Sequence, residues 1–161
     1  MERVAPMRPG TGTIVPRYST TVRTPWSSQR AFEYLSDLEH FADWDPGVKR
    51  STQVSGDGPG LGAGYDVTVS GVGRDLTLRY ETTAIDSPRR IEVRAETSKL
   101  LSVDVMTFLS TPDGGCDVTY DADLSLKGAL SIGNPILGLM FGRIGDRAAT
   151  GLRQAIEGTA V

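Results

Sequence analysis

Asp104 is the residue of this sequence with the clearest capacity for chemistry. It lies in a largely apolar run, 102–111, that is typical of a β-strand. Because successive side chains of a strand point to opposite faces, Asp104 shares a face with Met106 and Phe108. If that face is buried, the carboxyl loses hydration and its pKa rises, which suits a general acid or base near neutrality. The opposite parity, with Val105 inward, would expose Asp104, so both orientations stay open.

Four large aromatic side chains are candidates for contact with a bound molecule: Trp44, Tyr65, Tyr80 and Tyr120. A buried tyrosine presents an apolar ring and a polar hydroxyl together, so it either finds a partner in the core or anchors a ligand. Convergence of Asp104 with Tyr80 and Tyr120 would favour an enzyme, whereas an entirely apolar lining would favour a carrier.

Other catalytic and cofactor-binding patterns are weak. Gly58–Ala63 matches a dinucleotide-binding fingerprint in its letters, but a strand follows it where a helix is needed, and Pro59 lacks an amide for a phosphate. His40 is the only histidine, and no G-x-S-x-G turn accompanies it. A metal site would need converging carboxylates, and those between 113 and 123 alternate onto an outer face. We therefore predict neither a metal nor another cofactor.

Composition narrows the class of protein further. A chain of 161 residues suits one domain with a full core, and a net charge of -3 with interspersed signs does not favour nucleic-acid binding. Cys116 is the only cysteine, and no apolar run approaches the ~18 residues of a membrane span. We expect a cytoplasmic monomer or homodimer, with a disordered leader over residues 1–16 and a single ligand-binding domain over residues 17–158.

The pattern of elements predicts an antiparallel sheet interrupted by two short helices. A first strand is expected at 18–23, a helix capped by Ser27 follows, and a second helical turn spans about 38–42. The links between the later strands are short, which favours antiparallel pairing. Those six strands are predicted at 48–55, 64–71, 75–86, 89–97, 102–111 and 116–127.

The last element is a predicted amphipathic helix over 134–157. Its apolar stripe recurs every fourth residue: Ile136, Met140, Ile144, Ala148, Leu152 and Ile156. Leu137 and Phe141 widen the stripe, and only the sheet is large enough to bury it. A helix laid across a curved sheet leaves a space suited to a small apolar ligand, and we expect Phe141 to close that space.

These features resemble the helix-grip superfamily, which includes START lipid-transfer domains, birch-pollen allergens and bacterial polyketide cyclase/dehydrase proteins. The matching segments are Thr24–Pro25, Ala31–Asp37, Trp44–Val48, Gly60–Gly64, Asp113–Tyr120 and Leu152–Glu157. Gly115-Cys116-Asp117 departs from the Gly-Thr-Arg of many relatives. The resemblance implies an α+β fold in which a curved seven-stranded antiparallel sheet wraps around a long C-terminal helix, with two short helices after the first strand.

The resemblance also implies a protein that binds a polyketide, lipid or aromatic natural product without a cofactor. The alternatives are an aromatase/cyclase acting on a poly-β-ketone and a self-resistance protein that sequesters a reactive natural product. Asp104 is the candidate catalytic residue. The predicted ligand contacts come from inward strand positions, the turn and the long helix: Trp44, Tyr65, Val67, Leu78, Tyr80, Met106, Phe108, Tyr120, Leu137, Met140, Phe141 and Ile144.

Overall fold

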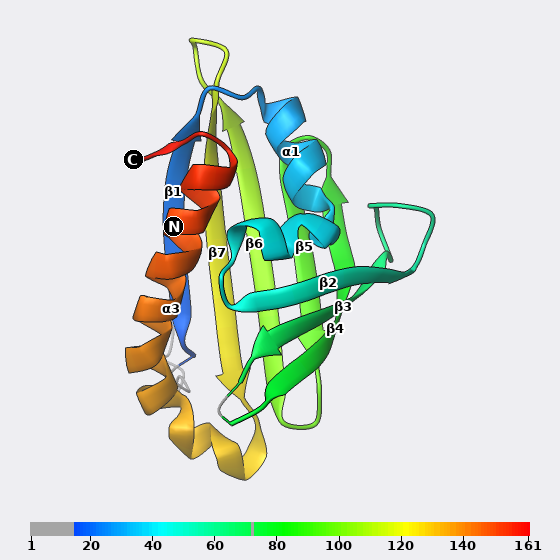
Figure 1. The fold of residues 1–161 in the computed structure, drawn as a ribbon, viewed down its shortest axis with the longest axis vertical. Coiled ribbons are helices and arrows are strands. Elements are labelled where there is room, and N and C mark those ends of the chain that lie inside the picture. The colour runs from blue at the N-terminus through cyan, green and yellow to red at the C-terminus, as the bar shows by residue number, and fades with distance from the viewer. Residues whose placement is uncertain (1–14, 72) are drawn as a thin grey trace, which may run out of the picture.

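A computed structural model describes residues 15–71 and 73–161 of the chain (Figure 1). The predicted leader over residues 1–16 lies almost entirely outside the described residues, which exclude residues 1–14. No helix within these two ranges is long and apolar enough to cross a membrane.

The described residues form an antiparallel sheet of eight strands together with three α-helices, which confirms the predicted α+β helix-grip fold. Each predicted strand and the long helix begin and end within two residues of the observed bounds. The short 3-10 helix η2 and the last strand, β8, were not predicted. In chain order the elements are β1 (Arg17–Thr24), α1 (Ser28–Ser36), the 3-10 helix η1 (Leu38–His40), α2 (Phe41–Trp44), β2 (Val48–Ser55), β3 (Gly64–Ser70), β4 (Asp75–Asp86), β5 (Arg90–Glu96), β6 (Leu100–Ser110), β7 (Cys116–Leu126), η2 (Gly128–Gly133), α3 (Asn134–Ala155) and β8 (Thr159–Ala160).

The strands lie in the order β2-β3-β4-β5-β6-β7-β1-β8. The strands from β2 to β7 follow one another as a meander because tight turns join them. The first strand of the chain pairs with β7, and Arg17 lies opposite Asp123 while Thr24 lies opposite Cys116. This pairing places β1 beside α3, which runs along it in Figure 1.

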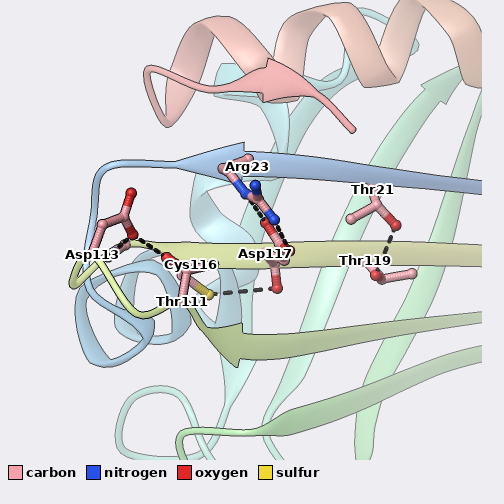
Figure 2. A network of polar contacts seen from close by, with 8 residues as sticks. Thr21, Arg23, Thr111, Asp113, Cys116, Asp117 and Thr119 are labelled. Carbon is pink, nitrogen blue, oxygen red and sulfur yellow. Dashed lines mark hydrogen bonds and ion pairs between the residues drawn. The ribbon is translucent and has the colours of Figure 1, made fainter.

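Polar side chains hold the outer face of the β1–β7 pair (Figure 2). The Arg23 guanidinium donates two hydrogen bonds of 2.7 Å to the Asp117 carboxylate. The hydroxyls of Thr21 and Thr119 lie 2.9 Å apart across the same two strands. Asp117 therefore supports the pairing of β1 with β7 on the outer face of the sheet, where the sequence predicted the carboxylates of this segment to lie.

The short helices pack over the concave side of the sheet. Ser27 caps α1 as predicted, because its hydroxyl accepts a hydrogen bond of 3.2 Å from the Arg30 amide. The helix buries Phe32 and Leu35, and the Phe32 ring meets Phe108 of β6 edge-on with the centroids 5.3 Å apart. This contact anchors one face of β6 toward the interior.

The predicted apolar stripe of the long helix is correct only in the second half of α3. Leu152 and Ile156 are fully buried as predicted. By contrast, Ile136, Met140 and Ile144 are 66%, 51% and 43% exposed, so the prediction that the stripe is buried along its whole length was wrong. In the first half of the helix, the buried face is centred on Phe141 and not on the predicted stripe.

Small side chains explain the rotation of the buried face. A Cβ atom at Gly145 would overlap the Tyr18 ring, and one at Gly151 would overlap the Trp44 carbonyl oxygen. Ala148 lies buried between them. Glycine and alanine therefore bring the α3 backbone close to β1 and α2, and the larger isoleucine and methionine side chains are left on the outside. Hydrophobic periodicity favours large apolar residues and so selects the wrong face in the first half of the helix.

Candidate functional site

A cavity of about 180 Å³ lies between the sheet and α3. An engineered apolar cavity of roughly 150 Å³ holds benzene, so this cavity has room for a substituted ring or a small fused pair of rings. Its apolar wall comes from α2, the sheet and α3: Phe41, Leu78, Ala122, Leu124, Phe141 and Ile144. Its polar wall contains Asp45, Tyr80, Ser102, Asp104 and Tyr120.

The orientation of β6 places Asp104 inside the cavity. Asp104 is only 4% exposed, and Ser102, Met106 and Phe108 on the same face are also buried. The Asp104 position pairs with Ala122 of β7, and β5 flanks the strand on its other side. Of the two parities that the sequence left open, the structure therefore shows the one that buries the carboxyl group.

The surroundings of Asp104 change its acidity. Burial raises the pKa of Asp104 to about 7, and the negative charge of Asp45 adds to this rise. A hydrogen bond from the Tyr120 hydroxyl opposes the rise in the pKa of Asp104 because it stabilises the ionised form. A carboxyl group with this pKa exists in both protonation states near neutrality, so it can donate or accept a proton.

Asp45 is the second carboxyl group of the cavity and comes from the turn between α2 and β2. Its Oδ1 accepts a hydrogen bond of 2.8 Å from the Gly47 amide, and this contact fixes the direction of the side chain. Burial raises the pKa of Asp45, while the Gly47 hydrogen bond lowers it in part. The two acids thus reach the same cavity from different elements, the turn after α2 and strand β6.

Two tyrosine hydroxyls complete the polar wall. Tyr80 donates a hydrogen bond of 2.8 Å to the Ser102 hydroxyl. Burial raises the pKa of Tyr80 and of Tyr120, and the nearby Asp104 carboxylate adds to both shifts. Both hydroxyls therefore stay protonated and act as hydrogen-bond donors. Phe41 packs edge-on against Tyr80, with centroids 6.3 Å apart, and helps to hold that ring in place.

The charge of the cavity wall is unbalanced. Among the described residues that line the cavity there is no Lys, Arg or His. Asp45 and Asp104 therefore lack a cationic partner in this wall, and an unpaired buried carboxylate is costly. Residues 15–71 and 73–161 also contain no group of three His, Cys, Asp or Glu side chains that could hold a metal ion. Perturbed acids of this kind in a cavity mark a candidate functional site.

Comparison with known families agrees with this architecture. Residues 16–157 match the family model described as polyketide cyclase / dehydrase and lipid transport. The chain belongs to this family. No curated protein sequence gives a significant match.

Solved structures with the same fold include a protein of the START superfamily and an aromatase/cyclase. A START superfamily protein from Mycobacterium smegmatis has a TM-score of 0.72 at 16% identity, and the match covers 88% of this chain and 97% of that chain. The Zhui aromatase/cyclase from Streptomyces sp. R1128 has a TM-score of 0.71 at 16% identity, with coverage of 89% and 94%. At such identities the likeness establishes a shared fold.

The predicted site residues of this polyketide cyclase/dehydrase family member occupy four kinds of position. The following predicted residues line the cavity: Leu78, Tyr80, Asp104, Tyr120, Phe141 and Ile144. A second set is buried in the core outside the cavity lining: Tyr65, Val67, Met106 and Phe108. Trp44 lies behind the wall, with its ring edge-on to Tyr120 at a centroid distance of 5.3 Å. Leu137 is half-buried and Met140 is exposed, and both lie outside the cavity lining.

Three polar residues of the cavity lining, Asp45, Ser70 and Ser102, were not among the predicted site residues. Asp45 stands in an Asp-Pro-Gly turn that the sequence does indicate, but the turn signal says nothing about where the carboxylate points. Ser102 lies two residues before Asp104 on the same strand face, so strand alternation would have identified it once the parity of β6 was known.

Proposed function

We propose that this chain binds a small, mostly apolar molecule in the cavity between the sheet and α3. The observation that carries the proposal is the cavity itself, where an apolar wall surrounds a few convergent polar groups, an arrangement typical of small-molecule sites. The family description, which includes polyketide cyclases and lipid transport, is consistent with ligands of this kind. A cavity of about 180 Å³ favours a ligand, or a ligand segment, no larger than a substituted single ring or a small fused pair such as indole.

Binding of indole, a neutral aromatic probe, tests this proposal. We expect saturable binding of about one indole per chain, without added metal or nucleotide, in a ligand-detected NMR titration. Phe141→Ala removes an aromatic ring that lines the cavity, so binding should weaken several-fold and unfolding should become easier by ~3 kcal/mol. Leu139→Ala is the matched control because Leu139 lies on the same helix and is 81% exposed. Non-saturable indole binding by the wild type would refute the proposal.

A second candidate function is proton-transfer catalysis on a bound carbonyl compound, as an aromatase/cyclase would require. The convergence of Asp104, Tyr80 and Tyr120 in one cavity favours it, because the carboxyl can exchange a proton while the tyrosine hydroxyls hold an oxygen atom. Positioning by the surrounding apolar wall would supply the rest of the rate enhancement.

Turnover of a poly-β-ketone separates this candidate from binding alone. Asp104→Asn should reduce the rate by ~10²-fold while indole binding stays nearly unchanged. Asp121→Asn is the control, because Asp121 lies on the neighbouring strand with outward parity, opposite Val105. Equal turnover by the wild type and Asp104→Asn would leave ligand binding as the function.

A further inference from the structure

The carboxyl groups of this protein fall into two environments with different partners. On the outer face of the sheet, Asp117 pairs with Arg23 at 2.7 Å and Asp123 pairs with Arg17 at 3.1 Å. Inside the cavity, Asp104 is almost fully buried, and the described lining residues offer it no cation. Because a buried carboxylate is stabilised chiefly by an opposite charge, the cavity lacks the partner that the outer carboxylates have.

Aromatic rings surround the same space. Phe41, Tyr80, Tyr120 and Phe141 all line the cavity, and the Phe41 and Tyr80 rings meet at 84°. Aromatic faces carry partial negative charge and attract cations, more strongly when water is excluded. Carboxylates and aromatic rings in one cavity therefore form a set of groups that favours a positive charge and disfavours a negative one.

We propose that the ligand of this cavity carries a protonated amine on a small apolar body, with Asp104 and Asp45 as its counter-ions. The inference rests on the proposed binding function and adds the chemical class of the ligand. The rings of Tyr80 and Tyr120 would contact both the apolar body of the ligand and its ammonium group. Free carboxylic acids are excluded as ligands because their negative charge would meet two acids and no base.

The affinity for such a ligand depends on pH. The ionisable groups that influence Asp104 are Asp45 from the turn, Asp123 and Tyr120 from β7, and Tyr80 from β4. From α3 the cavity receives only the apolar side chains of Phe141 and Ile144 among the described residues. Since the pKa of Asp104 is about 7, its carboxyl is mostly neutral in mild acid and mostly ionised above neutrality. A cation binds the ionised form, so its affinity rises with pH.

Three probes of equal ring size test the inference on the intact protein: benzylamine, benzyl alcohol and benzoate. At about pH 8 we expect benzylamine to bind ~10-fold or more tightly than benzyl alcohol, since hydrogen bonds to charged groups are stronger than those between neutral groups. At about pH 5.5, where benzylamine is still protonated but Asp104 is largely neutral, the ratio should fall several-fold. Benzoate should bind most weakly at both pH values.

Variants of Asp104 and Asp45 test whether these acids cause the preference for benzylamine over benzyl alcohol. Asp104→Asn should remove most of the preference for benzylamine, and Asp45→Asn should reduce it, while both retain binding of benzyl alcohol. Asp43→Asn is the control, because Asp43 is exposed on α2 and pairs with His40. Equal affinities for benzylamine and benzyl alcohol at both pH values would overturn the amine inference and leave the proposed binding function intact. Failure of all three probes to bind would overturn both.

Discussion

Asp104 is the residue at which burial and charge conflict most strongly. Its strand places it opposite Ala122, and the other carboxyl group of the cavity, Asp45, carries charge of the same sign. Replacing it with a neutral residue of similar size would remove this conflict without leaving a void. A group that costs the protein stability in this way is typical of a site selected for function.

We expect Asp104→Asn to change how stability depends on pH. The pKa of Asp104 is about 7 in the folded protein and ~3.9 in an unfolded chain. Between these values the folded state binds more protons, so the wild type loses stability as pH rises from about 4 to about 7. The variant carries no such dependence and should be more stable than the wild type by ~2–4 kcal/mol at about pH 8, with little difference near pH 4.

Urea unfolding at four pH values measures this difference. Asp121→Asn, on the outward face of β7, serves as the control and should keep the pH dependence of the wild type. If Asp104→Asn and the wild type lost stability in parallel between pH 4 and pH 7, Asp104 would not be the titrating group.

Helix α3 both packs against the rest of the fold and forms part of the cavity wall. Asn134 begins it, and its side chain accepts a hydrogen bond of 2.8 Å from the Leu126 amide and thereby ties the helix to the end of β7. The second half packs closely against β1 and α2 through small residues, while the first half contributes Phe141 to the cavity and leaves large apolar side chains such as Ile136 exposed. The helix is therefore anchored at both ends and packs less closely in the segment beside the cavity.

Two glycine substitutions in α3 should have opposite effects. Gly151→Ala places a methyl group against the Trp44 carbonyl, so we expect the free energy of unfolding to fall by ~1–3 kcal/mol. Gly142→Ala meets no atom within 4 Å and should raise it by ~0.5–1 kcal/mol, because alanine is the better helix former. Urea unfolding of both variants measures the difference, and a stabilising Gly151→Ala would contradict the close packing of α3 on α2.

The cavity is formed by segments that lie far apart in the sequence. The turn after α2 supplies Asp45, the sheet supplies Asp104, and α3 supplies Phe141. A ligand that touches all three walls can bind only when they are assembled. Its binding energy is therefore added to the stability of the folded state.

We expect indole at 100 times its Kd to raise the free energy of unfolding by ~2.7 kcal/mol, with no change in the urea m-value. Phe141→Ala at the same indole concentration should gain less, because its Kd is higher. A urea midpoint that stayed constant at saturating indole would show that the probe does not depend on the folded cavity.

Local sequence patterns identified most of the elements of this protein. Alternation of apolar and polar residues predicted the long strands, the short links between them implied antiparallel pairing, and Ser27 marked the beginning of α1. These features depend on neighbouring residues, so they can be read along the chain. The same patterns predicted Tyr80, Tyr120 and Phe141, which all line the cavity.

Long-range packing settled the features that local patterns leave open. The parity of β6, and with it the burial of Asp104, depends on contacts with β5, β7 and Phe32, which are distant in sequence. The buried face of α3 depends on how closely Gly151 can approach α2. Asp45 and Asp104 line the same cavity only because the turn after α2 packs over the sheet. Periodicity describes one element at a time, whereas a cavity and its charge arise only where several elements meet.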